Sequence, residues 1–180
     1  MMRVGLFGGS FNPPHQGHIH ISQLAIKKLG LNQIWWIPTA YNSFKEKGIY
    51  ESYTIRCEKC EKISKNHPKI HLKKISEIRS EKLIKNLQKK YRNHQFFWIM
   101  GADNLLRLHE WENFRGLIKT IPLAIFSREN FLLKISKTKS FQIYKKMLSA
   151  DKSLPKFKIF KTKNLNISST QIRNNAKLYS

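Results

Sequence analysis

The sequence predicts an α/β protein with a Rossmann-like open parallel sheet that is covered by helices on both faces. Two observations predict this class. Short apolar runs alternate with segments of helical apolar spacing, which is typical of parallel strands joined by helical crossovers. The alternation continues to the C-terminal end without an internal repeat or a low-complexity linker, so residues 1–180 are expected to form a single domain.

Six short apolar runs are the expected strands. They are RVGLF at 3–7, QIWWIP at 33–38, KIHLKKI at 69–75, QFFWIMG at 95–101, IPLAIFSR at 121–128 and KFKIF at 156–160. Helices are expected between them, at about 18–29, 53–64, 80–91, 140–148 and 168–175. In the first helix Ile21, Ala25 and Leu29 recur every four residues, and Gly30 is expected to end it.

The charge of the chain favours anionic partners. It has 34 Lys and Arg residues against 11 Asp and Glu residues, which gives a formal net charge of +23. Nucleic acids, acidic membrane surfaces and phosphorylated small molecules all fit such a field. The lysines are scattered beside apolar residues of the expected elements, so we interpret them as a solvated surface. We expect no specific nucleic-acid partner and no membrane partner, and the oligomeric state stays open.

The cysteines and the N-terminal segment indicate a cytoplasmic protein. The apolar stretch at 4–7 is too short for a signal peptide, and no segment approaches the roughly 18 apolar residues of a membrane span. Cys57, Cys60, His67 and His71 have the spacing C-x2-C-x6-H-x3-H, which suggests zinc. The six-residue gap is shorter than the roughly 12 residues of a zinc finger, so we favour buried thiols in a helix and expect no protein-held metal.

The turn after the first expected strand, GGSFNPPHQGH at 8–18, has the residues of a phosphate site. Gly8 and Gly9 let backbone N–H groups approach an anion, and the helix that opens at Gly17 and His18 directs its positive end to the same place. His15 and His18 can donate hydrogen bonds to the charge that develops on a transferring phosphate. The alternative is a turn with two surface histidines.

A second polar box, ISSTQIRNN at 167–175, lies near the other end of the chain. Ser168, Ser169 and Thr170 can cap a helix and offer hydroxyl and N–H groups to an anion, and Arg173 adds a permanent positive charge one turn later. The alternative is a simple helix cap.

Together these segments resemble a known family. The 8–18 turn resembles the H-x-G-H signature of the nucleotidyltransferase superfamily, in particular its nicotinate mononucleotide adenylyltransferase branch, and the 167–175 box resembles its I-S-S-T-x-I-R signature. WIMGADNLLRLHEW at 98–111 resembles the G-A-D-N-L segment of that branch. WWIPTAYNSFK at 35–45 resembles its W-x-x-P…N-P-x-K stretch, with Ser43 where proline is usual.

The resemblance implies transfer of AMP from ATP to nicotinate mononucleotide, which gives deamido-NAD and pyrophosphate, with Mg²⁺ on the ATP phosphates. ATP and nicotinate mononucleotide are the implied partners. The implied catalytic residues are His15, His18 and Arg173. The residues implied to bind ATP and its phosphates are Gly8, Gly9, Ser10, Phe11, Gly17, Asp103, Ser168, Ser169 and Thr170. Those implied to bind the pyridine nucleotide are Lys45, Trp111 and Arg128.

Alternatives remain for individual residues and for the function. Asp103 is expected to end the fourth strand and bond a ribose or adenine group, or else to cap the helix that follows; Trp111 is expected to stack on a pyridine ring or else to pack in the core. A sister enzyme, such as one that adenylylates pantetheine phosphate, and a nucleic-acid-binding protein are the alternative functions.

The chain departs from the family before the fourth strand. Where the family carries a Ser-Tyr-Thr-x-Asp-Thr run, this chain has RSEKLIKNL at 79–87. Backbone N–H groups at the helix start near Ser80 and Glu81 can still meet a carboxylate, because backbone donors do not depend on the side chain. We therefore expect a preference for the acid form of the pyridine nucleotide over the amide form.

Overall fold

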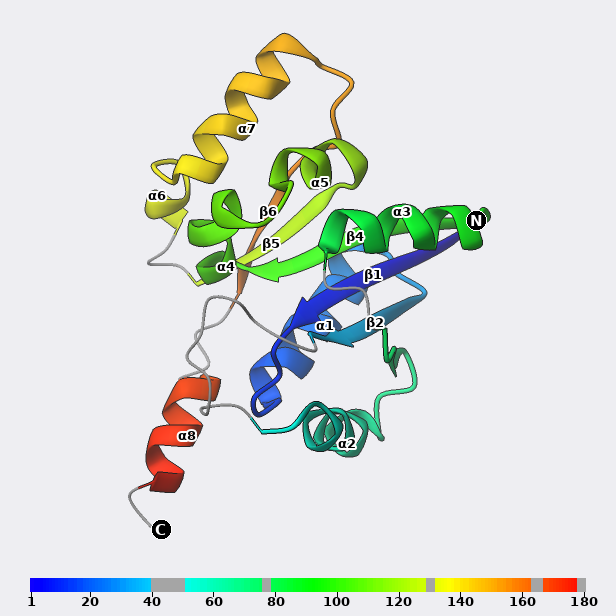
Figure 1. Ribbon diagram of the computed structural model, residues 1–180, viewed down its shortest axis with the longest axis vertical. Coiled ribbons are helices and arrows are strands. Elements are labelled where there is room, and N and C mark those ends of the chain that lie inside the picture. Colours follow the sequence, from blue (N-terminus) through cyan, green and yellow to red (C-terminus); the bar gives the residue numbers. More distant parts are fainter. Residues whose placement is uncertain (40–50, 76–78, 129–131, 163–166, 178–180) are drawn as a thin grey trace.

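The protein is an open parallel sheet with helices on both faces, which confirms the predicted fold class (Figure 1). The computed structural model describes residues 1–39, 51–75, 79–128, 132–162 and 167–177. The strands are β1 (Met2–Gly9), β2 (Gln33–Pro38), β3 (Ile70–Leu72), β4 (His94–Gly101), β5 (Leu123–Arg128) and β6 (Lys158–Thr162). The helices are α1 (Gln16–Leu29), α2 (Tyr53–Ser64), α3 (Ser80–Lys90), α4 (Ala102–Arg107), η1 (Leu108–Glu110), α5 (Phe114–Thr120), α6 (Leu132–Ile135), α7 (Lys139–Ala150) and α8 (Ser169–Lys177).

The strand order β3-β2-β1-β4-β5-β6 places β1 in the middle of the sheet, and every described strand pair is parallel. The chain leaves β1 toward β2 on one side and later returns to β4 on the other side. Open α/β sheets bind ligands outside the carboxyl ends of the strands at such a reversal point. The β1–α1 turn, which follows Gly9, therefore starts at the place where a ligand is expected.

Two hydrophobic layers cover the two faces of the sheet. Helices α3, α4, α5 and α7 pack on one face, over Leu6, Trp98 and Leu123 among others. Helices α1 and α2 pack on the other face, over Phe7, Trp36 and Ile99 among others. In Figure 1 helix α3 lies in front of the sheet and α1 behind it. Successive residues of the central strands are buried on opposite faces, as a covered parallel sheet requires.

The observed elements differ from the expected ones in several places, among them α6, which was not expected, and β6, which begins at Lys158 and not at Lys156. The first helix begins at Gln16, two residues before the expected His18, because His15 caps it. The third strand is limited to Ile70–Leu72, within the seven residues expected. Between β4 and β5 the chain forms α4, η1 and α5, whereas the sequence indicated a helix there only in the alternative that Asp103 caps it. Short helices of six and seven residues give too little periodicity to be read from sequence.

Cys57 and Cys60 are buried free thiols on α2, as expected. Burial raises the pKa of the Cys60 thiol to about 12, so this thiol stays protonated. Among the described residues no group of three or more His, Cys, Asp and Glu side chains is placed to hold a metal ion. Within the described ranges no helix has both the length and the apolar character that a bilayer crossing requires.

Candidate active site

The β1–α1 turn is anchored in the core by Phe11. This residue has a positive φ of 46° and a side chain that is only 1% exposed. Its ring stacks on Trp36 of β2, with centroids 4.9 Å apart and an interplanar angle of 22°. The predicted ATP contact of Phe11 is therefore limited to its backbone, because its side chain is a core residue. Gly8, Gly9 and Ser10 precede it and are partly exposed.

His15 and His18 form a reciprocal cap at the start of α1. Nδ1 of His15 accepts the N–H of Gly17, and Nδ1 of His18 accepts the N–H of His15, both at 3.1 Å. The two ring centroids are 4.0 Å apart. A Cβ atom at position 17 would lie 2.8 Å from the His15 ring, so glycine is required between the two histidines. The H-x-G-H spacing is therefore the spacing that lets His15 and His18 cap the start of α1 together, with glycine between them.

His18 presents a neutral hydrogen-bond donor. Burial, reinforced by the adjacent His15 ring, lowers the pKa of His18 from 6.5 to about 3. Because Nδ1 of His18 accepts a backbone N–H, the proton of its neutral ring lies on Nε2. Phe11 packs against the other side of the ring, with centroids 4.8 Å apart, and holds its orientation. His18 can thus donate to a phosphate oxygen without gaining or losing a proton.

Helix α8 is docked on this turn, although 156 residues separate the contacting positions. The Ser169 hydroxyl donates to the carbonyl of Pro13 at 2.9 Å, and Nη1 of Arg173 donates to the carbonyl of Asn12. Nη2 of Arg173 donates to the Thr170 hydroxyl at 3.2 Å. The two boxes at opposite ends of the sequence thus form one site.

This docking gives Arg173 a role that the sequence did not reveal. The sequence assigned Arg173 to the ATP phosphates, but in the structure its guanidinium also holds the turn. Ser168 acts as a helix cap, since its Oγ accepts the N–H of Gln171 at 3.2 Å. Thr170 is exposed. Ser168 therefore caps α8, whereas Ser169 and Arg173 connect α8 to the turn.

Two buried residues of the site were missed by the sequence analysis. Arg56 of α2 is 2% exposed, and its Nη1 donates to the carbonyls of Ser10 at 2.6 Å and Thr39 at 2.9 Å. Asn12 is 1% exposed, and its Oδ1 accepts the N–H of Glu51 at 3.2 Å. One signal could have revealed Arg56, because it lies four residues before Cys60 and so on the buried face of its helix.

The comparisons with known proteins agree with this arrangement. The Cytidylyltransferase-like family pattern matches residues 6–175. A probable nicotinate-nucleotide adenylyltransferase of Agrobacterium fabrum (strain C58) is 33% identical over 98% of this chain and 100% of its own length. Another from Ruegeria sp. (strain TM1040) is 36% identical over 79% of this chain and 77% of its own length.

The chain belongs to the cytidylyltransferase-like family, in its nicotinate-nucleotide adenylyltransferase branch. The resemblance of the two end boxes is thereby confirmed. Among solved structures, the Plasmodium falciparum nicotinic acid mononucleotide adenylyltransferase complexed with NaAD has a TM-score of 0.76 at 20% identity. The match covers 97% of this chain and 83% of that chain, so the two proteins share the fold.

The segment that resembles the G-A-D-N-L motif of the family differs in detail from expectation. β4 ends at Gly101, so the expectation that Asp103 ends the strand is wrong: Asp103 lies in the first turn of α4 and is exposed. Its side chain makes no capping hydrogen bond, since Gly101 is the N-cap residue. Trp111 is half-buried and packs edge-to-face on Trp98, with centroids 6.3 Å apart. Trp111 therefore contacts the core and keeps part of its surface exposed.

The start of α3, where the family run is missing, lies beside the segment that carries Trp111. Nε of Arg79 pairs with Glu112 at 2.9 Å. Glu81 in the first turn pairs with Lys85, which lowers the pKa of the Glu81 carboxyl. Of the other predicted pyridine contacts, Lys45 lies outside the described residues and Arg128 is the last residue of β5.

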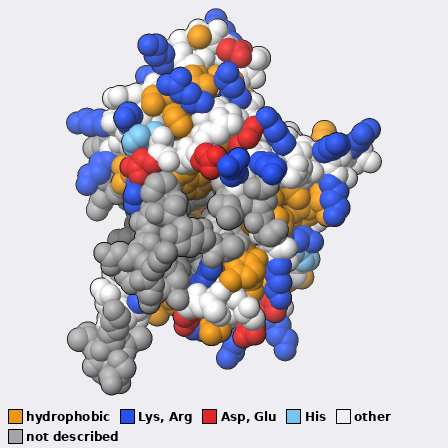
Figure 2. All heavy atoms as spheres, in the orientation of Figure 1, with side chains coloured by type: hydrophobic (Ala, Val, Ile, Leu, Met, Phe, Trp, Pro, Cys, Tyr) orange, Lys and Arg blue, Asp and Glu red, His pale blue; other side chains and the backbone are white. Residues whose placement is uncertain are grey.

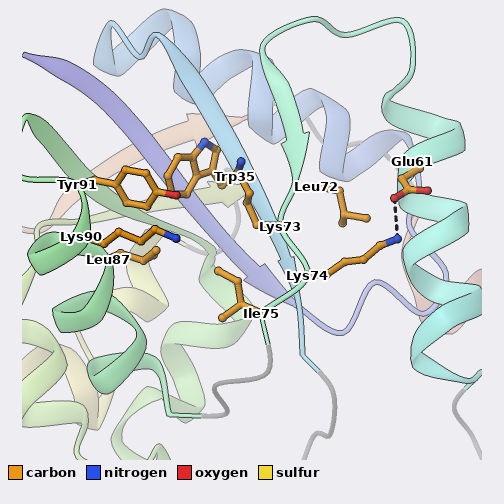
Figure 3. A pocket seen from close by; sticks show the side chains of 9 residues that line it. All are labelled: Trp35, Glu61, Leu72, Lys73, Lys74, Ile75, Leu87, Lys90 and Tyr91. Carbon is orange, nitrogen blue, oxygen red and sulfur yellow. Dashed lines mark ion pairs between the residues drawn. The ribbon is translucent and has the colours of Figure 1, made fainter.

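A cavity of about 510 Å³ lies elsewhere, between α3, β3 and α2 (Figure 3). Its lysines already have partners: Lys74 pairs with Glu61 at 3.0 Å, and Nζ of Lys73 lies 4.8 Å from the Trp35 ring centroid. None of the predicted site residues lines this cavity. It is therefore separate from the candidate active site.

On the face shown in Figure 2, Lys and Arg side chains are spread over several elements rather than gathered in one stripe. This distribution fits a solvated surface.

The low pKa of His18 makes stability depend on pH. The unfolded chain binds a proton at this position below about pH 6.5, whereas the folded chain binds it only near pH 3. The stability that this group contributes is therefore complete above pH 6.5 and is lost as the pH falls, at up to about 1.4 kcal/mol per pH unit. Urea denaturation of the wild type and of His18→Asn at pH 7 and pH 5 measures this. Between pH 7 and pH 5 the free energy of unfolding should fall by about 2 kcal/mol more in the wild type than in the variant. Equal falls would contradict the lowered pKa of His18.

Arg56 is expected to stabilise both the fold and the turn. Arg56→Met leaves the partly buried carbonyls of Ser10 and Thr39 without this donor, and each such group costs about 1–3 kcal/mol. The free energy of unfolding should fall by about 3 kcal/mol, and kcat of the folded protein by about 10-fold. Arg79→Met is the control, because its exposed pair with Glu112 should change stability by less than about 0.5 kcal/mol. A stable Arg56→Met protein with wild-type kcat would contradict this role.

Proposed function

We propose that the protein transfers AMP from ATP to nicotinate mononucleotide, giving deamido-NAD (NaAD) and pyrophosphate. The observation that carries this proposal is the docking of Ser169 and Arg173 on the turn that holds His15 and His18. The names of the Agrobacterium and Ruegeria relatives, and the NaAD in the Plasmodium complex, support the same substrates.

The site acts by alignment and charge stabilisation. An oxygen of the acceptor phosphate attacks the α-phosphorus of ATP in line, a new P–O bond forms, and the bond to the β-phosphate breaks to release pyrophosphate. No side chain forms a covalent bond. His18 would donate through Nε2–H to an oxygen of the transferring group, and it remains neutral throughout. Since the donors are already oriented by the cap, little reorganisation accompanies the reaction.

We propose that Mg²⁺ arrives on the ATP phosphates, where it would neutralise part of their charge. Such ions are commonly held by substrate phosphates and few protein ligands. The turn offers N–H donors and imidazoles for the phosphates, which fits an ion carried by ATP rather than one held in a protein cage. The arrangement of His15, His18 and Arg173 serves the phosphate oxygens directly.

A reducing compartment is consistent with the two buried free thiols, Cys57 and Cys60, and the cytoplasmic location stays a prediction. The spread of Lys and Arg supports the expectation of no specific nucleic-acid partner.

The function is tested by pyrophosphate release with ATP and Mg²⁺ against a panel of phosphorylated acceptors. Nicotinate mononucleotide should be used best, ahead of nicotinamide mononucleotide and pantetheine phosphate. His18→Ala should retain its fold and lose about 10²–10³ in kcat, because one preorganised donor is removed. His20→Ala is the matched control, since His20 lies on the same helix and bonds Thr162 of β6. A raised KM with normal kcat would reassign His18 to binding.

Arg173 is tested by the same assay with ATP as the varied substrate. Arg173→Ala removes a charge-assisted bond to the turn and a cation beside the phosphates, so kcat/KM for ATP should fall about 10- to 100-fold. Arg173→Lys should recover little, because an ammonium group does not reproduce the planar fork that reaches Asn12 and Thr170 together. Unchanged ATP kinetics in the alanine variant would remove Arg173 from the site.

A further inference from the structure

Three tryptophans lie in the central strands, and they differ in how their indole N–H groups are satisfied. The N–H of Trp35 donates to the side-chain oxygen of Gln33 at 2.9 Å, and that of Trp36 donates to the Ser22 hydroxyl at 2.8 Å. Trp98 is 3% exposed, yet its N–H finds no hydrogen-bond partner among the described residues. Because a buried donor without a partner is costly, this group needs an explanation.

The Trp98 indole lies at the carboxyl end of the sheet, over the start of the β1–α1 turn. A Cβ atom on Gly8 would be 2.9 Å from Cζ2 and Cη2 of Trp98 and 4.0 Å from Cε2, the carbon that carries the nitrogen. The indole thus reaches Gly8 with carbons of its six-membered ring, which requires glycine at position 8. Trp111 packs perpendicular to the same ring, with a half-exposed surface of its own. The ring that carries the unpartnered donor therefore contacts both the turn and the proposed pyridine-stacking residue.

We propose that the Trp98 indole N–H is a specificity-determining donor for the carboxylate of the acid form of the pyridine nucleotide. This inference rests on the proposed function, and it assigns the missing partner to the substrate. A pyridine ring stacked on Trp111 would lie next to the Trp98 indole, so its carboxylate group is an acceptor of suitable chemistry.

The chemistry of the indole favours the acid over the amide. An indole N–H is only a donor, so it can bond either oxygen of a carboxylate but cannot accept from the NH₂ of an amide. A hydrogen bond to a charged acceptor is also about twice as strong as one to a neutral acceptor. Since this chain has no Ser-Tyr-Thr run before α3, a side-chain donor from β4 gives an additional source of selectivity.

The test compares Trp98→Phe with Trp35→Phe. Both changes remove one indole from the same core cluster, but only the first removes the unpartnered N–H. With ATP and Mg²⁺ saturating, kcat/KM is measured for nicotinate and nicotinamide mononucleotides. The acid-to-amide ratio should fall about 5- to 10-fold in Trp98→Phe and stay at the wild-type value in Trp35→Phe. An unchanged ratio in Trp98→Phe, or equal losses in both variants, would overturn the proposal.

A second measurement keeps the inference testable if either variant folds poorly. In wild-type protein with ¹⁵N-labelled indoles, the four tryptophans give separate N–H signals, and saturating nicotinate mononucleotide should move the Trp98 proton signal downfield. Nicotinamide mononucleotide should move it less, and the Trp35 signal should stay in place. A Trp98 signal that does not respond to the acid nucleotide overturns the inference, even where pyrophosphate release has supported the proposed function. Binding that moves this signal without pyrophosphate release would instead overturn the function.

Discussion

Three backbone carbonyls of the β1–α1 turn, those of Ser10, Asn12 and Pro13, are held by side chains that come from distant parts of the chain. Arg56 binds the first from α2, while Arg173 and Ser169 bind the other two from α8. A turn of glycines, prolines and polar residues has little packing of its own, so these bonds define its shape. With these carbonyls bonded to Arg56, Arg173 and Ser169, the helix start that carries both histidines has a defined position over the sheet.

The same arrangement explains how a strongly basic protein holds a neutral histidine, His18, at the start of α1. The donors of Arg56 are directed to the carbonyls of Ser10 and Thr39, so this cation contributes a field more than a direct contact. The low pKa of His18 is caused mainly by burial against Phe11 and Trp36. A neutral donor of fixed tautomer can stabilise the transferring group at any pH near neutrality, whereas a titrating histidine would change its charge in that range.

Two aromatic clusters position the two sides of the site. Phe7, Phe11, His18 and Trp36 form a continuous set of ring contacts below the turn, and these rings hold the start of α1. Trp98 and Trp111 meet edge-to-face on the other side of the sheet. Position 8 links the two sides, since the glycine there leaves room for the Trp98 ring directly above the strand that begins the turn.

The sequence alone determined the α/β class, the six strands and the two end boxes, because apolar periodicity and short motifs are local properties of the chain. It also placed Cys57 and Cys60 correctly in a buried helix. It could not show that Arg173 bonds the carbonyl of Asn12, 161 positions away in the sequence, or that the buried Arg56 bonds the carbonyl of Ser10, 46 positions away. Nor could it show that Asp103 lies past the end of its strand. It could not separate Trp98 from Trp35 either, since both are strand tryptophans on the same face. Such hydrogen bonds form only where long-range packing brings a side-chain donor to within about 3 Å of a backbone carbonyl. Only the tertiary structure contains that information.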